Sequence, residues 1–286
     1  MKIVVIGSGF GGLTAAIRLQ AQGHEVTLLE KRDKPGGRAY VYEQDGFTFD
    51  GGPTIITAPW LIHDLFTLCG KKTEDYVTLI PINPFYNIRF EDGTVFYYNG
   101  DRENIIRQIR ELNPDDVEGY LKLAAKGEEI YKTGFELIDS PFLHFSDMMK
   151  VVPDLVRLQS QKSVAGFVNQ YIRDERLRQV FSFHPLLIGG NPFQSTSIYA
   201  LIHTLEQKFG VWFAMGGTGA LVRAMTKLFQ DMGGQLFLDS EVSEIVVDEA
   251  THRAVGVRLK NGDFVAADSV VSNADVAYTY LNMIPA

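Results

Sequence analysis

The first 30 residues contain the feature that most constrains the fold: an apolar run, a glycine-rich turn, a helical pattern and a second apolar run. Lys2–Ile6 has the composition of a buried parallel strand and leads directly into Gly-Ser-Gly-Phe-Gly-Gly at positions 7–12. A helical pattern covers 13–22 and stops before Gly23, and a second strand is predicted over 25–29. This order of strand, G-x-G-x-x-G turn, helix and strand predicts a unit that binds a dinucleotide.

Each residue type in this unit has a physical role in the prediction. Gly7 permits the tight turn, Gly9 lets the backbone approach a diphosphate, and Gly12 lets the helix pack closely on the strand. The free N–H groups at the start of the helix attract phosphate. Glu30 follows the second strand, where its carboxylate can accept the hydroxyls of an adenosine ribose and repels a 2′-phosphate, so NADP is not expected. The alternative is a plain glycine turn followed by a surface glutamate.

Composition excludes several classes of protein. The chain has 27 Lys and Arg against 35 Asp and Glu, a net charge of -8, which argues against nucleic acid as the main partner. Hydrophobic residues at 45% and charged residues at 22% are typical of a globular protein. The single cysteine, Cys69, cannot form an internal disulfide and favours a reducing, cytoplasmic compartment. No apolar run approaches the roughly 20 residues of a membrane span, and no histidine has the spacing of a metal site.

Two further glycine segments follow Glu30. Gly-Gly-Arg at 36–38 can bring a second flexible backbone and a cation to the same diphosphate, and 45–54 is predicted to form a strand followed by a turn with Gly-Gly-Pro-Thr. With these motifs, residues 1–54 resemble the large flavoprotein group that includes amine oxidases and carotenoid desaturases. The resemblance implies FAD as the cofactor, with Arg38 near the diphosphate and the 52–54 segment near the flavin. An ordinary turn is the alternative for the Gly-Gly-Pro.

The middle of the chain has a different character. A hairpin is predicted over 86–98, turned at Asp92-Gly93. The segment 142–158 is unusually apolar and is interpreted either as a helix lying on a membrane surface or as a helix packed against the rest of the chain. His184 and His203 are candidates for acid–base chemistry, although a histidine among apolar neighbours is more often a hydrogen-bonded core residue. The helical patterns of this region cover 102–112, 117–138, 148–158 and 177–183.

Three segments of this region, 181–193, 197–203 and 210–221, carry the most specific family signal. They closely resemble the bacterial and fungal type of phytoene desaturase, and this resemblance runs along nearly the whole chain. It implies an FAD-dependent oxidoreductase of carotenoid biosynthesis that dehydrogenates a long isoprenoid such as phytoene, by hydride transfer to the flavin and loss of a proton from the neighbouring carbon. Oxygen or a membrane quinone would be the electron acceptor. No residue is identified as the catalytic base, and composition alone indicates only a segment that could line an apolar tunnel.

The last third returns to the pattern of the first. An amphipathic helix is predicted over 218–232, and strands are predicted over 235–238, 241–248, 254–266 (a hairpin turned at Asn261-Gly262) and 269–274. The resemblance implies that the backbone of Val242 faces the adenine, whereas the residue alone would equally suit a plain strand. Related desaturases continue well beyond this point, so we expect the chain to be a fragment or the product of a shortened gene, and to be inactive by itself.

The sequence therefore predicts an α/β fold with a Rossmann-like FAD-binding domain at 1–75 and 211–286 and an inserted α+β substrate or membrane-associated helical domain at 76–210. The expected partners are a hydrophobic isoprenoid, a membrane surface to which the cytoplasmic protein binds peripherally, and oxygen or a quinone. A flavin amine oxidase and a non-catalytic prenyl-lipid carrier are the alternatives; the carrier would be expected to lack the phosphate-binding glycines. The predicted cofactor-binding residues are Gly7, Ser8, Gly9, Phe10, Gly11, Gly12, Glu30, Lys31, Gly37, Arg38, Gly52, Pro53, Thr54 and Val242.

Overall fold

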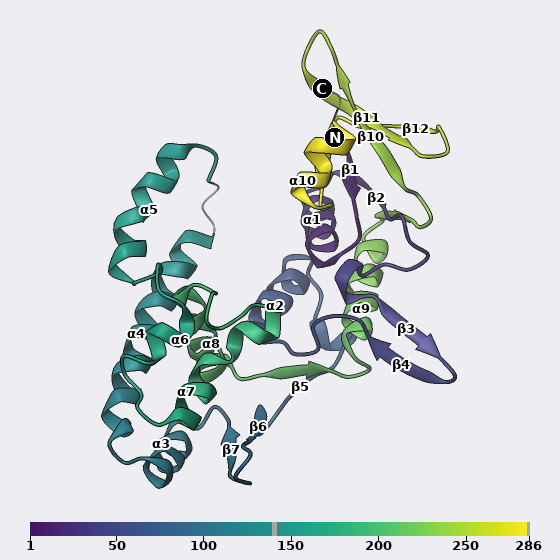
Figure 1. Ribbon diagram of the computed structural model, residues 1–286. Coiled ribbons are helices and arrows are strands. Elements are labelled where there is room, and N and C mark those ends of the chain that lie inside the picture. Colours follow the sequence, from purple (N-terminus) through teal and green to yellow (C-terminus); the bar gives the residue numbers. More distant parts are fainter. Residues whose placement is uncertain (139–141, 285–286) are drawn as a thin grey trace. The chain divides into compact units, whose positions relative to one another are not determined.

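The computed structural model describes residues 1–138 and 142–284, and the chain divides into two compact units (Figure 1). The first unit comprises Met1–Ile80 and Trp212–Ala286, and the inserted unit comprises Pro81–Val211. The predicted α/β fold class with a Rossmann-like sheet is confirmed. The domain boundaries predicted at 75/76 and 210/211, and the substrate-binding role of the insertion, stay predictions.

The first unit is built on a four-stranded parallel sheet whose strands, in spatial order, are β13 (Ser269–Ser272), β1 (Lys2–Ile6), β2 (Glu25–Leu29) and β9 (Gln235–Phe237). Ile6 is level with Leu29 on one side and with Ser272 on the other, so these three strands end at the same edge. Ligands of open α/β sheets bind beyond the carboxyl ends of the strands. The glycine turn, which follows β1, and Glu30, which follows β2, therefore lie at the expected edge.

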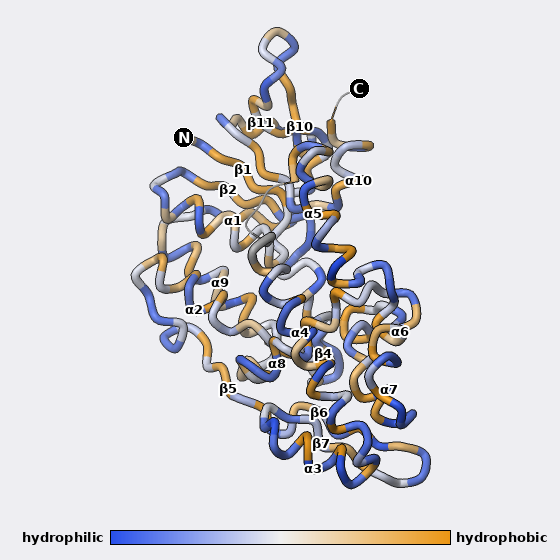
Figure 2. Tube along the Cα trace, turned by 90° about the vertical axis from the view of Figure 1, so that its left-hand side faces the viewer, coloured by the Kyte–Doolittle hydropathy of each residue, from blue (hydrophilic) through white to orange (hydrophobic). Residues whose placement is uncertain are grey.

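Both faces of β1 are covered, which explains why its sequence is continuously apolar (Figure 2). Ile3 and Val5 pack in one hydrophobic core, which includes residues of α1 (Phe10–Ala21) and α9 (Thr218–Asp231). Val4 lies in a second core on the other face. That face is covered by a three-stranded antiparallel sheet of β10 (Val242–Asp248), β11 (Arg253–Leu259) and β12 (Phe264–Ala266).

The two predicted hairpin turns are each three residues long, not two. In the first, the N–H of Phe90 donates to the carbonyl of Thr94 at 2.9 Å, and the β11–β12 turn has the same pattern. Gly93 and Gly262 are the last residues of the two loops and have φ angles of +85° and +96°. In a three-residue hairpin loop the final residue adopts this left-handed conformation, so glycine is required one place later than in a two-residue turn.

The remaining elements of the first unit are short, and α2 among them was not predicted. Its N-terminal end begins with a proline at the first helical position, a common helix start. These elements are η1 (Gly37–Ala39), β3 (Val41–Gln44), β4 (Phe47–Asp50), α2 (Pro59–Leu68), η2 (Thr73–Asp75), β5 (Leu79–Pro81), β8 (Trp212–Ala214), α10 (Val276–Tyr278) and η5 (Thr279–Met283).

The inserted unit is mostly helical and has its own core. In its hairpin, Phe96 and Tyr98 point into this core, where they join Ile105 and Ile109 of α3. The buried residues thus recur every second position along the strand and every fourth position along the helix. Asp101 caps α3 by accepting hydrogen bonds from two backbone N–H groups. The elements are β6 (Tyr86–Arg89), β7 (Val95–Tyr98), α3 (Arg102–Leu112), α4 (Asp116–Ile138), α5 (Phe145–Arg157), α6 (Val164–Val168), α7 (Glu175–Ser182), η3 (His184–Ile188), η4 (Ser197–Ala200) and α8 (Leu201–Phe209).

Helix α5 presents an apolar face to solvent. Its exposed apolar residues recur at helical spacing along one side, and Phe145, the first of them, is 80% exposed. Within α5 only Val151 is buried. None of the helices in the described part of the chain combines the length and the apolar character needed to cross a membrane. The exposed apolar residues of the α5 face are Phe145, Met148, Met149, Val152 and Val156.

Candidate functional site

The glycine turn between β1 and α1 has the tight geometry that its sequence predicts. Gly7 has a φ angle of +89°, and its N–H donates to the carbonyl of Leu29 at 2.8 Å. A Cβ atom on Gly12 would stand 1.8 Å from the carbonyl oxygen of Gly7, far inside any tolerable contact. Glycine is therefore required at position 7 by the backbone conformation and at position 12 by the protein's own packing.

Gly9 differs, because no close contact within the protein demands glycine there. A Cβ on Gly9 would meet its nearest neighbour, the Oδ1 atom of Asn273, at 3.5 Å, an ordinary van der Waals distance. Its φ angle of -64° is also open to any residue. Gly9 is the N-cap of α1, where the free N–H groups of the first turn point outward. The space beside Gly9 is thus available to a ligand that needs to approach the backbone.

The second glycine segment lies against the first. The N–H of Gly36 donates to the carbonyl of Ser8 at 3.0 Å, and Gly9 and Gly36 form a parallel β-bridge. A Cβ on Gly37 would stand 2.9 Å from the Cα of Gly9, so this contact also needs glycine. The structure therefore brings together the two segments that were predicted to share one diphosphate, although they are separated in sequence by β2.

Glu30 is buried and held in a fixed orientation. Its Oε2 atom accepts hydrogen bonds from the backbone N–H of Ser8 at 2.9 Å and from the Ser8 hydroxyl at 2.6 Å, and its Oε1 atom accepts from the N–H of Arg32 at 3.0 Å. Its exposed fraction is 4%. A carboxylate has about four lone-pair sites, so roughly one remains for a ligand hydroxyl. The second role of Glu30, which the sequence did not reveal, is to tie the end of β2 to the glycine turn.

Two of the predicted cations are exposed and unengaged. Arg38 and Lys31 have no acidic partner within 1–138 and 142–284, the parts of the chain that are described. Arg32, in contrast, lies over the ring of Tyr40 with its guanidinium carbon 3.5 Å from the ring centroid. Arg38 belongs to η1, directly after the contact between the two glycine segments. It is therefore the cation of this region best placed to pair with an incoming anion.

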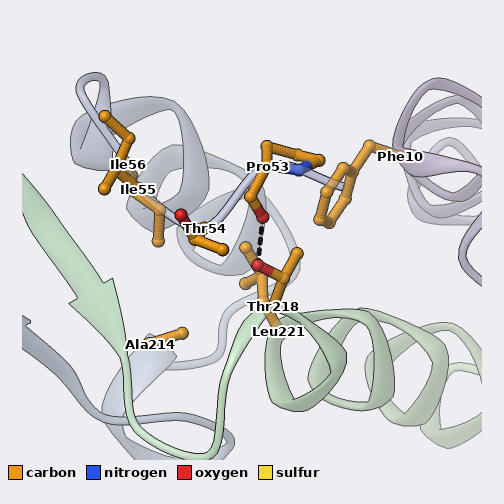
Figure 3. Close-up of a pocket in the computed structure, with 8 residues that line it drawn as sticks. All are labelled: Phe10, Pro53, Thr54, Ile55, Ile56, Ala214, Thr218 and Leu221. Atoms are coloured by element: carbon orange, nitrogen blue, oxygen red, sulfur yellow. Dashed lines mark hydrogen bonds between the residues drawn. The ribbon is translucent and has the colours of Figure 1, made fainter. Parts of the chain in front are cut away.

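The 52–54 segment meets the start of α1 at a small cavity of about 40 Å³ (Figure 3). A Cβ on Gly52 would stand 2.1 Å from the carbonyl oxygen of Arg38, so glycine is needed where this segment crosses η1. The cavity has room for about one water molecule, and a flavin ring would need the walls to open or would lie outside them. Its lining residues are Phe10, Pro53, Thr54, Ile55, Ile56, Ala214, Thr218 and Leu221.

Three of the residues that line the cavity lie far from the glycine turn in sequence. Ala214, Thr218 and Leu221 come from the return segment and were given no role at the site. The hydroxyl of Thr218 donates to the carbonyl of Pro53 (Figure 3). Its backbone N–H donates to the Oδ2 atom of Asp50 at 3.1 Å. The signal that could have found this contact is the Gly-Gly-Thr-Gly sequence at 216–219, a second glycine-rich entry into a helix.

Val242 lies at the start of β10 and is 6% exposed. Its side chain belongs to the same core as Val4 and Leu29, beneath the edge of the sheet where the strands end. The side chain is thus a packing residue, and only its backbone is left to face a ligand. The predicted approach of the adenine to this backbone stays a prediction.

His184 and His203 lie together in the core of the inserted unit. The Tyr98 hydroxyl contacts the Nε2 atom of His184 at 3.1 Å and also bonds the Nδ1 atom of His203. Glu206 accepts from the Tyr86 hydroxyl at 2.7 Å and contacts His184 Nε2 at 3.1 Å. All five side chains except that of Tyr86 are buried. The geometry favours hydrogen-bonded core histidines over the acid–base role considered from the sequence, which had no signal for Tyr98 or Glu206 as their partners.

The proton positions in this cluster follow from its partners. Because a carboxylate only accepts, His184 Nε2 carries the hydrogen that points to Glu206. The Tyr98 hydroxyl then donates to His203 Nδ1. Burial and the neighbouring His184 lower the pKa of His203 to about 3, so this ring is neutral at physiological pH. The Tyr120 hydroxyl contacts His203 Nε2 at 3.5 Å. Burial raises the pKa of Tyr120 to about 12.

Comparison with known proteins gives close relatives over almost the whole chain. The chain is 52% identical over 284 residues to a phytoene desaturase (lycopene-forming) of Pseudescherichia vulneris, covering 99% of this chain and 57% of the relative. It is also 52% identical over 281 residues to the Pantoea ananas protein of the same name, covering 98% and 57%. The chain thus spans a little over half the length of these relatives.

Among solved structures, a protein of Pyrococcus furiosus matches with a TM-score of 0.68 and 21% identity, covering 99% of this chain and 61% of that protein. At this identity the match shows the fold alone. The family model described as flavin-containing amine oxidoreductase matches residues 10–278. This match includes Glu30, the second glycine segment at 36–38 and the return of the chain to the sheet. The chain therefore belongs to the family of flavin-containing amine oxidoreductases.

Proposed function

We propose that the chain binds FAD across the carboxyl edge of the parallel sheet. The diphosphate would lie at the start of α1, beside Gly9 and within reach of Arg38, and the adenosine ribose would bond to Glu30. The flavin end would extend toward Pro53 and the cavity beyond it. FAD is the cofactor that the family supports, and the observation that carries the site is the space beside Gly9, which the protein's own packing leaves open.

We further propose that the protein takes part in the desaturation of a long isoprenoid such as phytoene. The support is the 52% identity to proteins named phytoene desaturase, which favours this reaction over amine oxidation. A bound flavin supplies the two-electron acceptor that removal of two hydrogens from an allylic C–C bond requires, since no side chain can do so. The residues of this chain would hold and orient the cofactor, and oxygen or a quinone would complete the redox balance.

The third part of the proposal is a peripheral contact between the α5 face and a lipid surface. An isoprenoid substrate is insoluble in water, so its enzyme has to collect it from a bilayer. Helix α5 has the exposed apolar stripe of an interfacial helix. The packed-helix alternative predicts that this stripe would be covered.

The cofactor site is tested with Gly9→Ala. The methyl group fits the free protein at ordinary contact distances but enters the space proposed for the diphosphate. We expect unchanged thermal stability without FAD and at least about tenfold weaker FAD binding, measured by flavin fluorescence. Gly134→Ala in α4, whose Cβ would meet its nearest neighbour at 3.7 Å, is the matched control and should leave FAD binding intact. Equal FAD affinity of Gly9→Ala and wild type would refute the assigned diphosphate position.

The reaction is tested by incubating the purified chain, loaded with FAD, with phytoene in liposomes and following the absorbance of conjugated products. Formation of a coloured polyene supports the desaturase proposal and contradicts the expectation that this chain is inactive by itself. Reduction of the flavin by amines in place of phytoene would favour the amine oxidase alternative. Failure of wild-type protein to bind FAD at all would overturn the cofactor proposal together with the reaction.

The membrane contact is tested by flotation with liposomes that contain anionic lipid. Met149→Asp combined with Val152→Asp places two charges in the α5 face and should abolish most of the flotation. Val276→Asp combined with Leu281→Asp makes the same change of charge at exposed apolar residues outside α5 and serves as the control. Equal flotation of the two double variants would contradict a specific role of α5.

A further inference from the structure

Asn273 occupies a position at the proposed cofactor site that the sequence analysis did not assign. It directly follows β13, the strand that pairs with β1 on the side opposite β2. The backbone N–H of Asn273 donates to the carbonyl of Ile6 at 2.9 Å. This bond extends the parallel pairing by one residue and holds Asn273 beside the glycine turn that follows β1.

The carboxamide of Asn273 has a fixed orientation. The N–H of Gly12 donates to its Oδ1 atom at 2.8 Å. Gly12 is the third residue of α1, and its N–H is one of the first-turn groups that have no partner within the helix. Because an N–H needs an oxygen as acceptor, this bond also decides which end of the amide is oxygen and which is nitrogen.

The nitrogen end of the amide points over the start of the helix. A Cβ on Gly11 would stand 2.6 Å from the Nδ2 atom of Asn273, so Nδ2 lies directly above that residue. Nδ2 has two N–H donors and no acceptor among the residues that the structure describes, and Asn273 is exposed. The Oδ1 atom, in turn, would stand 3.5 Å from a Cβ on Gly9. The carboxamide therefore borders the same open space that was proposed for the diphosphate.

We propose that Asn273 is a cofactor-binding residue with two functions: its Oδ1 accepts the Gly12 N–H, and its Nδ2 donates to an oxygen of the FAD diphosphate. This inference rests on the proposed function, since it needs a diphosphate at the start of α1. It adds a donor from a segment 261 residues away from Gly12 in sequence. The return segment thus completes the anion site, in which the backbone N–H groups of the helix and a side-chain amide face the same ligand.

The two functions are separated by Asn273→Asp. A carboxylate still accepts the Gly12 N–H, and a negative charge at the start of a helix is favourable, so the thermal stability of the FAD-free protein should be equal or higher. The Nδ2 donor, however, is replaced by an anionic oxygen that faces the diphosphate. We expect FAD affinity to fall at least about tenfold, and part of this loss to disappear as salt is raised from about 0.05 to about 0.5 M.

Asn273→Ala removes both functions, so stability without FAD and affinity for FAD should both fall. Asn87→Asp, at an exposed position of β6, controls for the change in net charge and should bind FAD as wild type does. The opposite responses of stability and affinity in Asn273→Asp are the result that a purely structural cap cannot produce.

FAD binding is measured by fluorescence titration and stability by thermal unfolding of the FAD-free full chain. If wild type binds FAD and Asn273→Asp binds it with equal affinity, the Nδ2 contact is refuted while the proposed cofactor site stands. If wild type does not bind FAD, both the contact and the proposed function are overturned.

Discussion

Tyr98→Phe removes a single hydroxyl group from the buried cluster of the inserted unit, and its cost can be worked out from the partners of that group. Tyr98 is fully buried, and its O–H donates to the Nδ1 atom of His203. Without the hydroxyl, His203 Nδ1 is a buried acceptor with no partner. His184 keeps its bond to Glu206, so one orphaned group is the main loss.

A buried polar atom left without a hydrogen bond costs about 1–3 kcal/mol. His203 cannot escape this cost by protonation, because burial and His184 hold its pKa at about 3. Changing its tautomer would not help, because Nδ1 would then be a buried N–H donor without a partner, while the Tyr120 hydroxyl, 3.5 Å away, lies at Nε2. We therefore expect the free energy of unfolding to fall by about 2 kcal/mol in Tyr98→Phe, measured by urea denaturation at pH 7.5.

Tyr97→Phe is the matched control, because Tyr97 is the next residue of β7 and is 52% exposed. Its loss of a hydroxyl should change stability by less than about 0.5 kcal/mol. In a His203→Leu background, Tyr98→Phe should cost much less, since both partners are then apolar. If Tyr98→Phe matches Tyr97→Phe, or if its cost is the same with and without His203, the assigned hydrogen bond is wrong.

Three further outcomes are expected. The pKa of His203 falls from 6.5 to about 3 on folding, so its contribution to the free energy of unfolding is fully present above pH 6.5 and declines as the pH falls toward 3, by at most about 1.4 kcal/mol per pH unit. Urea midpoints measured against pH should therefore decline less steeply for His203→Leu than for wild type. Gly12→Ala should lower the melting temperature more than Gly23→Ala, because a Cβ at position 12 would meet a backbone oxygen at 1.8 Å. Position 23 has open space, and alanine there costs only the strain of a positive φ, about 1–2 kcal/mol. Equal shifts of the two variants would contradict the packing argument. Asp101→Ala should lower the free energy of unfolding in urea by about 1 kcal/mol, because the cap of α3 is lost. Asp101→Asn should keep most of the wild-type stability, since its amide oxygen can still accept from the same N–H groups.

The sequence by itself determined the first βαβ unit and the family. The turn could be predicted because its constraints are local: Gly7 needs a positive φ, and Gly12 has to clear a carbonyl only five residues before it. The apolar run of β1 likewise reports burial on both faces, which is a property of a parallel strand wherever the neighbours come from. Hydrophobic period and backbone freedom are encoded within a few residues, so they can be recognised before the chain is folded.

Only the tertiary structure decided which distant residues complete the sites. The strand order β13-β1-β2-β9 brings Asn273 to the N–H of Gly12, and nothing in the sequence around either residue states that order. The packing of the inserted unit in the same way gives His203 its partner Tyr98. A single hydrogen-bonding side chain leaves no periodic signal, because its partner is chosen by the three-dimensional path of the chain and not by its neighbours in sequence.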